Sequence, residues 1–149
     1  MKRMTTILIL NLFFSMLTAP PDHIIYIARS DYEMNQLTWS NIDFWMRKYE
    51  IRHPEIVMAQ IKHETGNLTS RFCREQNNLC GMRLARCRAT TAIGEYNRMA
   101  IYQHWRKSLE DYSIWQKRYY KDGDYYKFLS RHGYAEDIWY NWKLKRIKL

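Results

Sequence analysis

The acidic residue with the clearest chemical potential in this sequence is Glu64, in the stretch KHETGN. It precedes Thr65 and Gly66, where an apolar helical pattern stops, so it falls in the last turn of a predicted helix. A helix C-terminus carries partial negative charge, which disfavours ionisation of a carboxyl group there. A carboxyl group that keeps its proton near neutral pH can act as a general acid. Glu64 is therefore either a catalytic acid or a surface residue of the last turn.

Two short motifs overlap this stretch, and neither predicts a site. His63-Glu64 begins like the zinc-protease pattern His-Glu-x-x-His, but the fifth position is Asn67, so the second metal ligand is missing. Asn67-Leu68-Thr69 matches a glycosylation sequon, which is informative only in a eukaryotic secretory context. We therefore expect no metal and no cofactor.

The three cysteines also lack the pattern of a reactive or metal-binding site. They lie seven residues apart, without the close Cys pairs and nearby His of zinc motifs; they are Cys73, Cys80 and Cys87. No local pattern pairs a cysteine with His63 or His104, as a cysteine nucleophile would require. In an oxidising compartment the three cysteines predict one disulfide and one remaining thiol.

The elements that would position Glu64 are helical. Pro54 stands at a favoured first helical position, and the apolar stripe that follows predicts a helix over about 54–65. Before it, Ser40-Asn41 can cap another helix. The apolar side of that earlier helix would be made of Phe44, Trp45 and Tyr49.

Beyond Glu64 the sequence predicts a loop-rich segment and then three more helices. Residues 66–98 show no long periodic stretch, and a small β-hairpin is expected within 90–101. One helical face would consist of Trp105, Leu109, Tyr112, Trp115 and Tyr119. A short helix is expected at about 125–131, and a last one from about Ala135. The last helix would carry Ile138, Trp142 and Ile147. Most of the 6 Trp and 12 Tyr residues fall on such stripes, so we interpret them as core rather than sugar-stacking residues.

The N-terminal segment has the composition of a secretory signal. Lys2 and Arg3 precede an apolar run over 5–17, and a small residue, Ala19, follows it. The run is short for a membrane span, although an uncleaved membrane anchor is the alternative because Pro20 makes the cleavage site unclear. We expect residues 1–19 to be a signal peptide or anchor, 20–38 a linker or arm, and 39–149 one domain.

The charge of the chain limits its partners. The net charge of +9 falls to +7 if residues 1–19 are removed, because Lys2 and Arg3 leave with them. A basic exported protein can bind nucleic acid, anionic lipid or anionic cell-wall polymer. Export to the periplasm, cell envelope or medium makes nucleic acid the least expected partner, and we expect a monomer. The basic residues of 143–148 suit a helix C-terminus and do not by themselves predict a binding patch.

Three ordered motifs span about residues 54–140. AQIKHETGNLTSRFCREQNNLCGMR, residues 59–83, has the form Ala-Gln-x-x-x-Glu-[Ser/Thr]-Gly followed by Asn-Asn-Leu-x-Gly. AIYQHWRKSLEDYSIWQ and FLSRHGYAEDIWY follow, the latter containing Gly-Tyr-Ala-x-Asp. Together these motifs resemble the glucosaminidase domain of glycoside hydrolase family 73.

The resemblance implies a mainly α, lysozyme-like fold with a small loop or β-hairpin lobe. It implies that Glu64 is the general acid that protonates the glycosidic oxygen. The substrate-binding residues that it implies are Asn77, Asn78, Gly81 and Tyr134, of which the first three shape the cleft floor. The sequence departs from the family at Cys80, which stands where the family usually has Phe, and this puts one packing contact in doubt.

The resemblance also implies a second carboxylate. Glycosidases commonly use two, roughly 5–5.5 Å apart when the second is a nucleophile and about 6.5–9.5 Å apart when it activates water. In this family the partner is variable and lies in the mobile lobe, which makes Glu95 the positional candidate. Asp111 aligns with a helix aspartate of the family and is the other candidate, although it could equally be structural.

The resemblance implies a peptidoglycan hydrolase, an endo-β-N-acetylglucosaminidase that cuts the glycan strand after N-acetylglucosamine. A muramidase or lytic transglycosylase is the alternative enzyme, because a lysozyme-like fold with one Glu also supports those cuts. The alternative without catalysis is a cell-wall-binding module that kept the fold, and the presence of Glu64 argues against it.

Overall fold

The computed structural model describes residues 31–134, 137 and 139–149 of the chain. It divides into two units, Met1–Asn35 and Gln36–Leu149. The described part of the first unit, residues 31–35, is helical. The predicted signal or anchor over 1–19, and the linker up to residue 30, lie outside the described residues.

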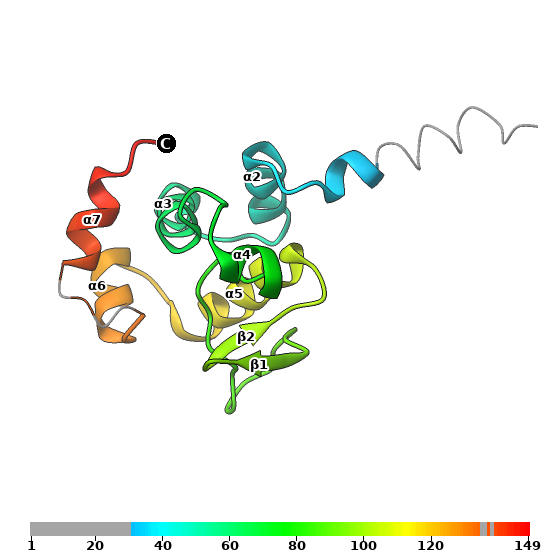
Figure 1. Ribbon diagram of the computed structural model, residues 1–149. Coiled ribbons are helices and arrows are strands. Elements are labelled where there is room, and N and C mark those ends of the chain that lie inside the picture. Colours follow the sequence, from blue (N-terminus) through cyan, green and yellow to red (C-terminus); the bar gives the residue numbers. More distant parts are fainter. Residues whose placement is uncertain (1–30, 135–136, 138) are drawn as a thin grey trace, which may run out of the picture. The chain divides into compact units, whose positions relative to one another are not determined.

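The second unit is mainly helical and carries one small antiparallel hairpin, which confirms the predicted fold class (Figure 1). Its elements are α2 (Trp39–Lys48), α3 (Pro54–Thr65), α4 (Arg71–Gln76), β1 (Gly94–Tyr96), β2 (Met99–Ile101), α5 (Trp105–Tyr119), α6 (Tyr125–Arg131) and α7 (Tyr140–Arg146). In Figure 1 the hairpin lies at the opposite side of this unit from α3.

The hairpin falls within the predicted range of 90–101. Its register pairs Gly94 with Ile101 and Tyr96 with Met99. The two turn residues, 97 and 98, both have positive φ, as a tight two-residue β-turn between twisted strands requires. Short strands and a tight turn therefore build the small lobe.

The core of the second unit is centred on α5. Its predicted apolar face is largely confirmed, since Trp105, Leu109, Tyr112 and Trp115 are buried. Tyr119, at the end of that stripe, is instead 37% exposed because it faces a cleft described below. The helix thus contributes both to the core and to the wall of the cleft.

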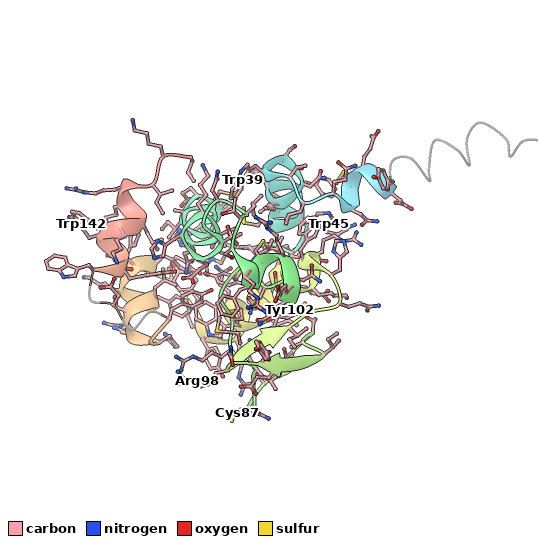
Figure 2. The ribbon with its side chains drawn as sticks, viewed as in Figure 1. Trp39, Trp45, Cys87, Arg98, Tyr102 and Trp142 are labelled. Carbon is pink, nitrogen blue, oxygen red and sulfur yellow. The ribbon has the colours of Figure 1, made fainter. Side chains whose placement is uncertain are left out.

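Three local expectations were wrong. The cap of α2 is Thr38, whose hydroxyl accepts from the Asn41 N–H at 3.2 Å, so the helix begins before the predicted Ser40-Asn41 cap. The six-residue α4 was not expected, since it is too short to show a period. The last helix, α7, begins at Tyr140 and leaves Trp142 exposed, at the outer edge of the unit in Figure 2. Its buried face is set by Tyr140 and Leu144 instead. Ala135 and Ile138, which the prediction included, lie outside the described residues.

The cysteines do not form the predicted disulfide. All three are free: Cys73 and Cys80 are buried and Cys87 is exposed, at the lower edge of Figure 2. The two buried thiols fill the core as small apolar side chains. In the described part of the chain, no helix has both the length and the apolar character that a membrane crossing requires.

Candidate active site

Glu64 lies in the last turn of α3, as the sequence predicts. The helix ends because Gly66 adopts a left-handed conformation, with φ of +52°. Its backbone N–H then faces the carbonyl groups of Lys62 and His63. The end of α3 thereby fixes the backbone of Glu64, whose side chain is half-buried and lines a cleft.

The carboxyl group of Glu64 contacts two segments that are distant in sequence. The hydroxyl of Tyr140, the first residue of α7, donates to Oε1 at 2.9 Å. On the other side, a Cβ atom at Gly81 would lie 2.8 Å from Oε2. Gly81 also has φ of +64°, so both the backbone and the close approach require glycine there. The carboxyl group is therefore held between α7 and the loop after α4.

Burial is the main influence on the pKa of Glu64. Removal from water disfavours the charged carboxylate and raises this pKa above its ordinary value. The hydrogen bond from Tyr140 and the electrostatic influence of His63 act in the opposite direction but do not cancel the effect. Glu64 consequently keeps its proton to a higher pH than a solvated glutamate does, which suits a proton donor.

A chain of buried hydrogen bonds supports this carboxyl group from behind. Gln60 Nε2 donates to the Tyr140 hydroxyl at 3.2 Å, and Gln60 Oε1 accepts from the Tyr112 hydroxyl at 2.7 Å. The Tyr112 and Tyr125 hydroxyls are 2.6 Å apart, and Gln116 Nε2 donates to Tyr125 at 2.8 Å. These hydrogen bonds connect α3, α5, α6 and α7, so the position of Glu64 depends on four helices.

The two predicted asparagines shape the loop beside Glu64. Asn78 is buried; its Nδ2 donates to the carbonyl groups of Met82 and Ala100, and its Oδ1 accepts from the Met82 N–H. Asn77 has positive φ and donates to the carbonyl group of Tyr102 at 3.0 Å. Their side-chain amides therefore bind the protein's own backbone, and they tie the loop that carries Gly81 to β2.

Tyr134 lies on the cleft wall with Glu64. Its hydroxyl donates to the carbonyl group of Cys80, and its ring packs against Tyr112 and Trp115 at centroid distances of 5.8 and 5.3 Å. Burial raises the pKa of Tyr134 well above its usual value, so this hydroxyl stays protonated. Tyr134 thus holds the loop that presents Gly81.

The cleft has a volume of 770 Å³, which is enough for an oligosaccharide segment. The loop after Gly81 forms one side and contributes three arginines, namely Arg83, Arg86 and Arg88. Aromatic residues from α5, α7 and the segment after α6 also line it, namely Trp115, Tyr119, His132, Tyr134 and Tyr140. Among the described residues, no group of three His, Cys, Asp or Glu side chains could hold a metal ion.

Glu95 lies on β1 of the hairpin. Its carboxylate pairs with Arg86 at 2.6 Å, and 28% of the Glu95 side chain is exposed. Glu95 is not among the described residues that line the cleft, although its partner Arg86 is. The structure therefore places this carboxylate on the hairpin, in contact with one arginine of the cleft lining.

Asp111 is fully buried within α5. Its two oxygens accept from Arg88 at 2.6 and 3.1 Å, and the Tyr102 hydroxyl donates to it at 2.8 Å. These contacts fix the loop after Gly81, which carries Arg88, to α5 and to Tyr102, the residue that follows β2. Asp111 is therefore one half of a buried ion pair.

Sequence reasoning gave no role to Asp137 and Tyr140, which both line the cleft. Asp137 pairs with Lys143, whose hydrogen bond lowers the pKa of that carboxyl group and keeps it ionised. The sequence did contain a signal for Asp137, because this residue is the final Asp of the Gly-Tyr-Ala-x-Asp motif. Tyr140 has no local signal, since its partner Glu64 is 76 residues earlier in the chain.

The fold and the cleft define a mainly helical protein with a small β lobe and a site centred on one half-buried glutamate. The family model described as Glucosaminidase, mannosyl-glycoprotein endo-beta-N-acetylglucosaminidase, matches residues 41–148. The chain belongs to this glucosaminidase family, which supports a function of the glycan-hydrolase kind. A search of curated proteins found no match, and a search of solved structures found none either.

Proposed function

We propose that this protein is a peptidoglycan hydrolase, an endo-β-N-acetylglucosaminidase that uses Glu64 as its general acid. The observation that carries the proposal is a half-buried carboxyl group with a raised pKa, held at the wall of a cleft of 770 Å³. Membership of the glucosaminidase family supports the choice of a glycan as substrate. Cleavage after N-acetylglucosamine rests on the three sequence motifs.

The contacts of Glu64 suggest which oxygen carries the proton. Tyr140 donates to Oε1, so Oε1 acts as an acceptor and the acid proton is assigned to Oε2. Oε2 is the oxygen next to Gly81, where the absence of a side chain leaves room. In this mechanism Oε2 protonates the glycosidic oxygen as the bond to the sugar breaks.

The second carboxylate is assigned to Glu95 in this proposal, and Asp137 is the alternative. Glu95 lies on the hairpin lobe but pairs with Arg86, whereas Asp137 lines the cleft. Turnover by Glu95→Gln and by Asp137→Asn, with both variants folded by circular dichroism, separates the two. A larger loss in Asp137→Asn contradicts the assignment to Glu95. Asp111 is given the structural role described above.

Two measurements test the reaction. Digested peptidoglycan is reduced with borohydride and hydrolysed, and mass spectrometry should then detect N-acetylglucosaminitol. Reduced N-acetylmuramic acid would instead show a muramidase, anhydro-muramyl ends a lytic transglycosylase, and no new ends a binding module. Glu64→Gln should lower turnover about 10²- to 10⁴-fold. The control is Glu75→Gln, which makes the same change at an exposed position of α4 and should leave turnover unchanged.

We also propose that the protein is exported and acts on the anionic cell wall, which the net charge of +9, or of +7 without residues 1–19, favours. The basic start and apolar run within residues 1–19 support export, with cleavage or retention as a membrane tether as the two outcomes. N-terminal sequencing of protein recovered from the cell envelope distinguishes them. Full-length protein confined to the cytoplasmic fraction contradicts export.

A further inference from the structure

The cleft has two chemically different walls. One is aromatic: Trp115 and Tyr119 come from α5, and His132 follows α6. The Tyr119 and His132 ring centroids are 5.7 Å apart, and Tyr119 is partly exposed. Aromatic faces pack well against the apolar face of a sugar ring. The other wall, over residues 81–88, carries three arginines within six positions and has no regular secondary structure.

Arg88 anchors this second wall. Its side chain is 5% exposed and pairs with the fully buried Asp111 at 2.6 Å. Breaking a buried ion pair by removing one partner leaves an uncompensated charge, so this contact is a fixed part of the fold. It attaches the loop to α5 and thereby presents the preceding residues of the loop to the cleft.

Arg86 differs from Arg88 in its exposure. Its side chain is 73% exposed and pairs with Glu95 at 2.6 Å. An exposed ion pair contributes little to stability, and a guanidinium group has five N–H donors. A ligand carboxylate can therefore share Arg86 with Glu95 or replace Glu95. Arg83, also exposed, lines the same wall three residues earlier.

We propose that Arg83 and Arg86 bind a carboxylate carried on a branch of a sugar, while the aromatic wall receives the sugar ring. The proposal rests on the glycan-hydrolase function proposed above and names the feature of the glycan that the cleft selects. Guanidinium groups suit carboxylates because two parallel N–H groups match the two oxygens. In peptidoglycan, muramic acid carries such a branch, which ends in a lactyl carboxylate or continues into an acidic peptide.

The test compares three soluble glycan strands with the full-length protein. The first strand retains its peptides, the second is stripped of peptide and keeps the free lactyl carboxylate, and the third is the stripped strand after methyl esterification. The variant is the double substitution Arg83→Gln and Arg86→Gln. The matched control is Arg71→Gln on α4, because Arg71 is 77% exposed and pairs with Glu75 at 2.8 Å. It removes one arginine charge away from the cleft, whereas the double variant removes two.

On strands with a free carboxylate, the double variant should raise KM about tenfold more than it does on the esterified strand, as expected when binding to the carboxylate is lost. Because Arg86 also pairs with Glu95, kcat can change as well, but by the same factor on all three strands. On the esterified strand, the KM values of the variant and the native protein should agree within about twofold. Arg71→Gln should match the native protein on all three strands. If KM rises only on peptide-bearing strands, the arginines bind a peptide carboxylate. If KM rises on stripped strands, they bind the lactyl carboxylate.

The proposal is overturned if the double variant raises KM as much on the esterified strand as on the charged strands. It is also overturned if KM is unchanged on both charged strands. Binding of the same strands, followed by tryptophan fluorescence, provides a measurement that does not need turnover. If the native protein cuts no strand, the proposed function fails. The arginine proposal then stands only if charged strands bind more tightly than the esterified strand and the double variant removes that difference.

Discussion

Adding one methyl group at Gly81 should displace the proposed acid without unfolding the protein. In Gly81→Ala the new Cβ would lie 2.8 Å from Glu64 Oε2 and 3.0 Å from Cδ, whereas ordinary contacts begin at 3.4 Å. The carboxyl group must therefore move by about 0.6 Å or more, the difference between 3.4 and 2.8 Å. Such a movement disturbs the 2.9 Å hydrogen bond from Tyr140 to Oε1.

Two costs follow from this geometry, and they affect different measurements. A misplacement of about 1 Å in a catalytic group can lower turnover about 10²-fold, so kcat should fall by up to that factor. Placing alanine at a φ of +64° costs roughly 1–2 kcal/mol of the free energy of unfolding. The first cost should appear in peptidoglycan turnover and the second in urea denaturation.

Gly123→Ala is the matched control for the cost of placing alanine at a positive φ. Gly123 has φ of +97°, and a Cβ there would meet nothing within 4 Å. This variant should also lose stability but should keep its turnover, because it lies outside the cleft lining. If folded Gly81→Ala turned over substrate within about threefold of the native rate, the close approach to Glu64 would have no catalytic importance.

Three other substitutions each change one polar group of the cleft or of the residues that support it. Tyr140→Phe deletes the hydroxyl that donates to Glu64, so the pKa of Glu64 should rise further and the high-pH limb of the pH–rate profile should move upward; an unchanged limb refutes this. Asp111→Asn leaves the buried Arg88 without its carboxylate and should lower the free energy of unfolding by about 3–5 kcal/mol in urea titrations, a much smaller loss being contrary evidence. Because the pKa of Glu64 is raised on folding, the native protein loses stability as the pH rises from the ordinary glutamate pKa through that raised value. Glu64→Gln does not titrate, so it should gain stability relative to the native protein across this window, and a constant difference from pH 4 to pH 8 would contradict the burial argument.

Local sequence signals predicted the helices that position Glu64. Pro54 and Gly66 bound α3 at the predicted residues, because proline favours a first helical position and glycine accepts the left-handed conformation that ends a helix. The short α6 also matches the prediction, with Asp124 as its cap and Arg131 as its end. In these cases the information lies within a few residues of the element.

The failures come from segments whose structure depends on contacts far along the chain. The last helix was expected to bury Trp142, but α7 is oriented by Tyr140, which reaches back to α3 through Glu64 and Gln60. No local pattern encodes such pairings.

The sequence by itself determined the family, the helical class and the identity of Glu64 as the carboxyl group at the end of α3. Only the tertiary structure decided the environment of that carboxyl group, because Tyr140 and Gly81 approach it from elsewhere in the chain. It also separated Arg88, buried against Asp111, from the exposed Arg86, although the two arginines are two residues apart. The physical reason is that periodicity and capping act over a few residues, whereas burial, pKa and ion pairing depend on which distant segments pack together.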